Sequence, residues 1–111
     1  MEVSQTKYKR CDLYKVNGRV DSFTAPQLAE ALAESTNEGQ HNIVLDLSGA
    51  DYVSSAGLRV MIDVQKTCKH GSRGELVLVG VPKRIFETLE LAGFVPLFRF
   101  FDDVTAAVAD F

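Results

Sequence analysis

The chain has 111 residues, of which 46% are apolar and 24% charged, a composition typical of one globular domain and not of a disordered or fibrous chain. Its 12 basic and 15 acidic side chains give a net charge of -3, so it lacks the charge excess expected of a nucleic-acid-binding protein. No apolar stretch approaches the roughly 18 residues of a membrane span, and the first residues lack the apolar core of a signal peptide. We therefore expect a single cytoplasmic domain over residues 1–111 that contacts neither membrane nor nucleic acid.

Cysteine and histidine are too sparse in this sequence for most catalytic or metal sites. Cys11 and Cys68 form no CxxC motif, and His41 and His70 belong to no metal-ligand pattern. Because histidine is the commonest general base, its scarcity counts against many classes of enzyme. We expect reduced thiols, no metal ion and no cofactor.

The first third of the chain predicts a strand or hairpin followed by a helix. Residues 7–20 are rich in Tyr, Val and Leu with rough alternation, and Gly18 is expected to interrupt the strand. A helix then begins near Thr24, which is expected to cap it, with Pro26 in the first turn. Residues 37–40 end this helix.

Two near-continuous apolar runs, Ile43–Leu47 and Leu76–Val79, predict strands that are covered on both faces of a sheet. Between them, Gly57–Lys69 has helical periodicity, and its predicted inward stripe consists of Val60, Met61, Val64 and Cys68. A strand, a helix and a strand of these lengths form a parallel crossover unit.

The last third predicts a helix, an edge strand and a final helix. Pro82 opens the third helix and Gly93 ends it; Leu97–Phe100 forms the strand, and Asp102 or Asp103 caps the last helix. The whole pattern predicts an α/β fold: a mixed, mostly parallel sheet of about four to five strands with about four helices packed against it.

The segment from Asp46 to Leu58 carries most of the functional information. It is expected to run from the end of a buried strand, through a loop, to a helix N-terminus, at the sheet edge where ligands and partners of open α/β sheets bind. Ser54 and Ser55 lie at the helix start. Two interpretations are open. The serines serve only as an N-cap, which is the commonest role of serine before a helix, or the hydroxyl of one of them is well placed to carry a phosphate.

Four segments in order, Gly18–Asp21, Leu45–Ser48, Tyr52–Leu58 and Leu91–Phe94, resemble the single-domain STAS proteins that act as anti-sigma factor antagonists. The resemblance covers nearly the whole chain and implies a partner switch. In such proteins the unphosphorylated form binds an anti-sigma factor with GHKL-type serine kinase activity, and phosphorylation of one serine releases the complex. A PP2C-type phosphatase restores the binding form.

The resemblance places the phosphorylated serine at Ser55, with Ser54 as the second choice. The family commonly has Asp-Ser-Ser-Gly where this chain has Ser54-Ser55-Ala56-Gly57. Ser54 therefore replaces the aspartate beside the acceptor and becomes a competing site.

The partner-binding surface is expected to include Asp21, Asp46, Ser54, Ser55, Gly57, Leu58 and Ile62. Asp21 corresponds to an acidic residue that the family places near the acceptor, although it is equally suited to a turn. Asp46 is predicted to close the central strand. It either orients the serine loop, contacts the nucleotide of the kinase, or serves only as a turn residue. Leu58 and Ile62 form either a docking face or a second buried flank of the helix.

Three alternatives to an anti-sigma factor antagonist remain open. The first is a partner switch with another target, such as a secretion or signalling pathway. The second is a small serine hydrolase that uses Ser55, but Val53 stands where a GxSxG motif has its first glycine, and no triad histidine is recognisable. A nucleotide-binding sensor is the third, and no Walker-type glycine loop supports it. We expect that the protein is not an enzyme.

Overall fold

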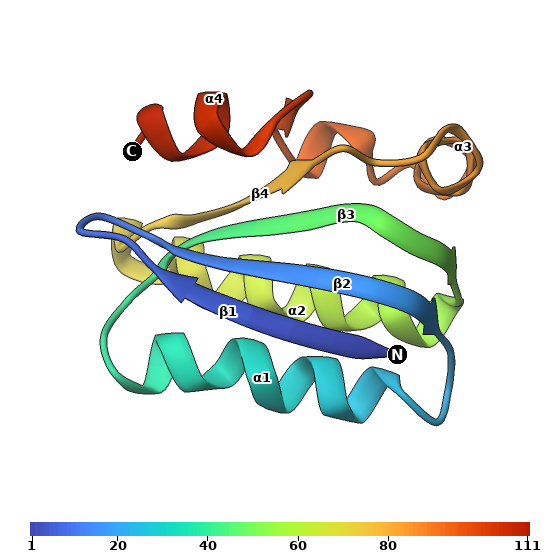
Figure 1. Ribbon diagram of the computed structural model, residues 1–111, viewed down its shortest axis with the longest axis horizontal. Helices are drawn as coiled ribbons and strands as arrows, with labels where there is room; N and C mark the ends of the chain where they lie inside the picture. The colour runs from blue at the N-terminus through green and yellow to red at the C-terminus, as the bar shows by residue number, and fades with distance from the viewer.

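A computed structural model describes residues 1–111, which form one five-stranded sheet with helices on both faces (Figure 1). The strands lie side by side in chain order, β1-β2-β3-β4-β5. β1 is antiparallel to β2, and all other neighbours are parallel. The mixed, mostly parallel sheet predicted from the sequence is confirmed. The strands are β1 (Glu2–Lys7), β2 (Asp12–Val20), β3 (Asn42–Val53), β4 (Glu75–Val79) and β5 (Phe100–Phe101).

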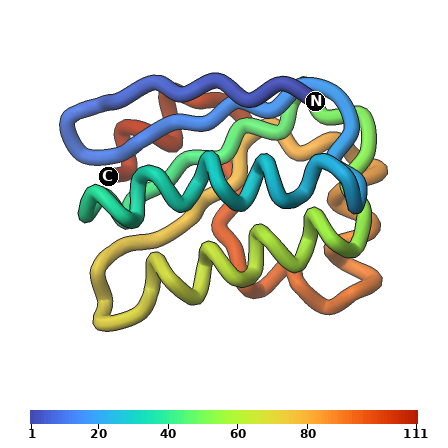
Figure 2. The backbone as a smooth tube through the Cα atoms, turned by 90° about the horizontal axis from the view of Figure 1, so that it is seen from below, coloured from blue at the N-terminus to red at the C-terminus, as the bar shows by residue number.

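Two long helices, α1 and α2, lie side by side on one face of the sheet (Figure 2), and α4 covers the other face (Figure 1). α3 lies beyond the end of β4 and adds Ile85 and Leu89 to the core below α1 and α2. None of the helices is long and apolar enough to cross a membrane. The helices are α1 (Ala25–Asn37), α2 (Ser55–Lys69), α3 (Lys83–Leu91) and α4 (Val104–Ala109), with 3-10 turns η1 (His70–Ser72) and η2 (Val95–Leu97).

β3 is the central strand, and its side chains alternate between two apolar clusters. Ile43, Leu45 and Leu47 pack into the larger cluster below α1 and α2, whereas Val44 packs into the smaller one below α4. Because both faces are covered, both sets of positions are apolar. This explains the unbroken apolar run in the sequence.

The two cysteines are buried in different clusters, Cys11 in the smaller and Cys68 in the larger, and both are free thiols. Burial raises the pKa of Cys11, and it raises the pKa of Cys68 to about 11. Neither thiol is ionised at neutral pH, and the two form no disulfide, as the sequence predicts.

The N-terminal hairpin differs from its prediction in where it begins. β1 starts at Glu2 and pairs with β2, but its mostly polar, exposed residues give no apolar alternation by which to recognise a strand. Gly18, with φ of +93°, lies at a register shift between β2 and β3, yet β2 continues to Val20. The glycine therefore marks an irregularity rather than a strand end.

α1 begins where the sequence predicts, directly after Thr24, but the predicted side-chain cap is absent. The Thr24 hydroxyl instead accepts from the backbone N–H of Asp21 at 2.8 Å and lies 3.0 Å from the carbonyl of Arg19, to which it donates. The turn that precedes the helix uses this hydroxyl, so it does not reach the free N–H groups of α1.

The C-terminal third follows the predicted order with one displaced strand. α3 follows Pro82, and Gly93 has the positive φ, +77°, expected of a helix-ending glycine. Where a strand over Leu97–Phe100 is predicted, η2 comes first and β5 has only the residues Phe100–Phe101. Asp103 caps α4 by accepting from the N–H of Ala106 at 2.8 Å.

The buried face of α2 is rotated from its predicted position. Its buried side chains are Leu58, Met61, Gln65 and Cys68, while Val60 and Val64 are only half-buried. The Gln65 amide accepts from the N–H of Leu76 at 2.8 Å and donates to the carbonyls of Leu76 and Leu97, at 3.0 and 2.8 Å. The Gln65 side chain thus supplies hydrogen-bond partners for the backbone N–H and C=O of Leu76, at the edge of β4 that the short β5 does not reach.

Replacement of Gln65 by leucine should destabilise the protein by about 2 to 4 kcal/mol, because buried backbone groups of β4 would lose their partners. Urea unfolding, followed by circular dichroism, measures this loss. Lys66→Leu, at the exposed neighbouring position, is the control and should change stability by less than about 0.5 kcal/mol. Equal stability of the Gln65 and Lys66 variants would contradict this role of the amide.

Candidate functional site

The candidate site is the junction at which β3 passes into α2. β3 continues to Val53, paired with β2, and the N–H of Ser54 then donates to the carbonyl of Val20 at 2.8 Å. α2 begins at Ser55. The prediction that Asp46 closes the strand and that a loop follows is therefore wrong. Beyond Leu47 the residues are mixed in polarity, yet the backbone remains in the sheet.

Gly57 allows α2 to approach the ends of β2 and β3 closely. A Cβ at this position would lie 2.7 Å from a methyl carbon of Val20 and 2.8 Å from one of Val53. Such distances are too short for carbon atoms in contact, so a side chain would push the helix away from the strands. The buried Gly57 therefore fixes the position of the helix N-terminus.

The two serines at this N-terminus have different surroundings. Ser54 is the N-cap: it is half-buried, and its Oγ accepts from the N–H of Gly57 at 3.3 Å. Ser55 is the first residue of the helix and is exposed, and its hydroxyl makes no hydrogen bond within the protein. The structure thus separates a capping serine from a free one.

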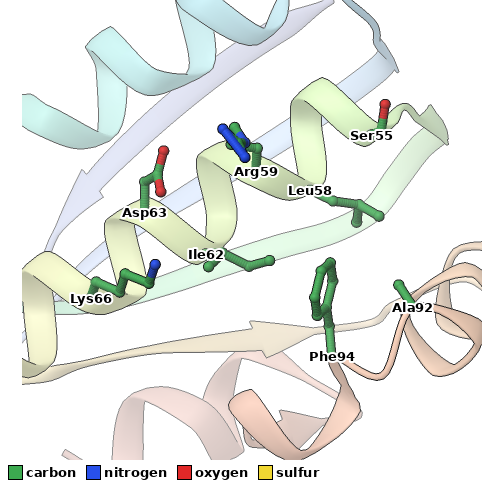
Figure 3. A pocket seen from close by; sticks show the side chains of 8 residues that line it. All are labelled: Ser55, Leu58, Arg59, Ile62, Asp63, Lys66, Ala92 and Phe94. Carbon is green, nitrogen blue, oxygen red and sulfur yellow. The ribbon is translucent and has the colours of Figure 1, made fainter.

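Ser55 stands at one end of a groove of about 580 Å³ between α2 and the segment that follows α3. Figure 3 shows Leu58 and Ile62 on the α2 side, directed toward Phe94, with Arg59 and Asp63 on the outer side of the helix. The groove therefore has an apolar wall with charged groups along its rim. Its lining residues are Ser55, Leu58, Arg59, Ile62, Asp63, Lys66, Ala92 and Phe94.

Leu58 and Ile62 each combine the two roles that the sequence leaves open. Leu58 is almost fully buried and belongs to the larger core cluster, and the half-buried Ile62 packs against that cluster. Both also line the groove. Each residue therefore contributes both to the core and to the wall of the groove.

Asp21 directly follows the β2 residue to which Ser54 is bonded, so it lies at the same edge of the sheet as the serines. Its carboxylate accepts from the N–H of Phe23 at 2.9 Å and of Thr24 at 3.1 Å. The hydrogen bond from the Thr24 backbone is the main cause of its lowered pKa. Asp21 therefore fixes the turn between β2 and α1.

Asp46 is buried on the other face of the sheet. Side chains alternate between the two faces along a strand, so Asp46 faces the same side as Val44, which belongs to the cluster under α4. Leu45 and Leu47 face α1 and α2. One carboxylate oxygen of Asp46 accepts from the N–H of Ser48 at 2.9 Å. This placement does not bring Asp46 beside the serines, and its predicted part in partner binding stays a prediction.

The sequence does not indicate several surface residues at this end of the molecule. Arg59, Ala92 and Phe94 line the groove, but the two walls come together only in the folded chain. Phe23, in the turn held by Asp21, and Leu91, beside Ala92, are 90% and 91% exposed. They are the two most exposed of the large apolar side chains.

Neither histidine can serve Ser55 as a general base. His41 precedes β3 and His70 follows α2, so both lie at the far ends of elements whose other ends meet at the site. The 15 residues of α2 place His70 roughly 20 Å from Ser55. No group of three or more acidic, histidine or cysteine side chains is arranged to hold a metal ion.

Comparison with known proteins gives the same family as the sequence resemblance. The profile of the STAS domain family matches residues 3–107. The chain is 40% identical to the protein BtrV of Bordetella bronchiseptica over 96 residues, 86% of this chain and 82% of BtrV. It is 32% identical to the anti-sigma-B factor antagonist of Staphylococcus aureus over 79 residues, 71% of this chain and 72% of that protein.

The structure of the Bacillus cell fate determinant SpoIIAA in its phosphorylated form has the same fold, with a TM-score of 0.78 over 98% of both chains at 11% identity. Five strands in this order, flanked by these helices, define a STAS domain. Within that class, the chain belongs to the anti-sigma factor antagonist family. Members of the family are regulators and not enzymes, which excludes the serine hydrolase alternative.

Removal of the Ser54 side chain should weaken the start of α2. Ser54→Ala loses the cap on the Gly57 N–H and should cost about 1 kcal/mol of stability, whereas Ser54→Asp, an equally good cap, should cost little. Urea unfolding of both variants measures the difference. Ser55→Ala is the matched control, because the Ser55 hydroxyl has no partner in the protein; a larger loss in that variant would contradict the assignment of the cap.

Proposed function

We propose that this protein is a phosphorylation-controlled anti-sigma factor antagonist, and that Ser55 is the phosphorylated residue. The observation that carries the proposal is the exposed, unbonded hydroxyl of Ser55 at the N-terminus of α2, at one end of an apolar groove. The unphosphorylated form binds a cytoplasmic anti-sigma factor with GHKL-type serine kinase activity. Phosphorylation ends the complex, and a PP2C-type phosphatase restores it.

The chemistry of this step is supplied by the kinase. The Ser55 Oγ forms a bond to the γ-phosphorus of ATP as the bond from that phosphorus to the bridging oxygen breaks, and ADP leaves. The hydroxyl proton passes to a base of the kinase. This chain contributes only an accessible hydroxyl in a fixed position, in agreement with the lack of a nearby histidine.

A phosphate on Ser55 is compatible with the fold. It adds about 1.5 to 2 negative charges at a helix N-terminus, where free N–H groups and the helix dipole favour an anion. The phosphorylated form of SpoIIAA, which has the same fold, supports a modification that leaves the architecture intact. The switch therefore acts at the surface.

The groove is the surface on which we place the anti-sigma factor. Its apolar wall, formed by Leu58, Ile62 and Phe94, offers area to bury, and Ser55 at its end comes under the edge of any protein that covers it. Burial of a phosphate dianion without a cationic partner costs several kcal/mol. A cost of about 4 kcal/mol reduces affinity roughly a thousandfold, enough to release the partner.

Ser54 takes the structural place of the family's aspartate and does not compete for the phosphate. Aspartate and serine are equally good N-caps, and the Ser54 Oγ is occupied by the N–H of Gly57. Phosphorylation of Ser54 would require this bond and the half-buried position to be given up. The exposed Ser55 needs no such change.

Incubation with ATP and the GHKL-type kinase encoded nearest to this gene should add one phosphate to the wild-type protein, as measured by intact mass spectrometry. Ser55→Ala should remove the added mass, and Ser54→Ala should retain it, because only the Ser55 hydroxyl is free. Ser55→Asp should bind the same kinase more weakly than the wild type does. Full labelling of Ser55→Ala would move the site elsewhere and end the assignment.

Loss of apolar surface in the groove should weaken the complex with the same kinase. Ile62→Thr is expected to lower affinity about tenfold in isothermal titration calorimetry, which corresponds to about 1.4 kcal/mol. Val64→Thr is the matched control: Val64 is also half-buried and aliphatic on α2, but it does not line the groove. Equal affinities of the two variants would exclude the groove as the docking surface.

A further inference from the structure

Arg59 lies one helical turn after Ser55, on the rim of the same groove. Both residues are exposed, and in Figure 3 both side chains leave α2 on its outer side, away from Leu58 and Ile62. Arg59 forms no ion pair within 4.0 Å. Three other cations do: Lys7, Arg19 and Arg99, the last with two acids. Its guanidinium is therefore available to a new anion.

The spacing and order of the two residues favour a contact after modification. Residues four apart on a helix have Cβ atoms about 5 to 6 Å from each other, and an acidic group placed before a basic one gives the stronger pair. A phosphate on Ser55 would stand in this order with Arg59. Asp63, four residues after Arg59, stands in the weaker reverse order and forms no ion pair with it.

We propose that Arg59 is an internal clamp that holds the phosphate of phosphorylated Ser55. The inference rests on the proposed function, because it assigns a further role to a residue beside the proposed acceptor. The guanidinium offers paired N–H donors that match two phosphate oxygens. Lys66, the other cation of the groove, lies 11 residues from Ser55, roughly 16 Å along the helix, and is too far away to replace it.

The clamp makes phosphorylation change two features of the groove at once. The modification adds a dianion at the end of the groove, and it draws a free cation from the rim onto that dianion. A partner that had met an uncharged hydroxyl and an available arginine then meets a phosphate of about two negative charges, of which Arg59 balances only one. To cover it, the partner must still desolvate an ion pair and a remaining negative charge. The contact with Arg59 also restricts the rotamers of the phosphorylated Ser55 side chain, so the charge stays at the docking surface.

The test uses phosphoserine introduced at position 55 by genetic code expansion, so that no kinase is needed. Phosphorus NMR across a pH titration measures the second pKa of the phosphate. An adjacent cation favours the dianion, so Arg59→Gln should raise this pKa by about half a unit relative to the otherwise unchanged phosphoprotein. Arg59→Lys, which keeps the charge, should stay near the unchanged value.

Lys66→Gln is the matched control, since it also removes one cation from the groove, and it should leave the pKa of the phosphate unchanged. An equal pKa with and without Arg59, or an equal rise in Lys66→Gln, overturns the clamp. This failure differs from failure of the proposed function. Absence of kinase labelling at Ser55 would remove the proposed switch, whereas the titration would still report whether Arg59 contacts a phosphate at this position.

Discussion

The close contact of Gly57 with Val20 and Val53 is the constraint on which the rest of the site depends. Without a side chain at this position, α2 comes against the ends of β2 and β3, and its first residue is held at the sheet edge. The bond from Ser54 N–H to the Val20 carbonyl fixes the same junction from the backbone side. The exposure of Ser55 and the direction of Leu58 toward Phe94 follow from this placement.

The elements that the sequence predicts well are those with a local signal. β3 and β4 are recognised by apolar runs, because both faces of the central sheet are covered, and Gly93 marks the end of α3 through its positive φ. The helix start at Ser54 and Ser55 follows from capping chemistry and from the family pattern. Capping chemistry was enough to place both serines at a helix N-terminus, but only the family pattern singles out Ser55 as the candidate acceptor.

The features that the sequence does not reveal depend on contacts between distant segments. Gln65 looks like a solvent-facing residue until the short β5 leaves the edge of β4 to be satisfied by its amide. In the sequence Asp46 looks like the end of a strand, because the apolar run stops close to it. β3 nevertheless continues to Val53 through residues of mixed polarity. The groove joins α2 to Ala92 and Phe94, which no periodicity within α2 can indicate.

The two cysteines of this chain are poorly placed to react with oxidants. Oxidants attack the thiolate, and both cysteines lie inside the core with a raised pKa, about 11 for Cys68. Oxidation of either thiol is therefore disfavoured in the folded protein. In the proposed switch, a peroxide signal would therefore have to act on the kinase or the phosphatase and not on a thiol of this chain.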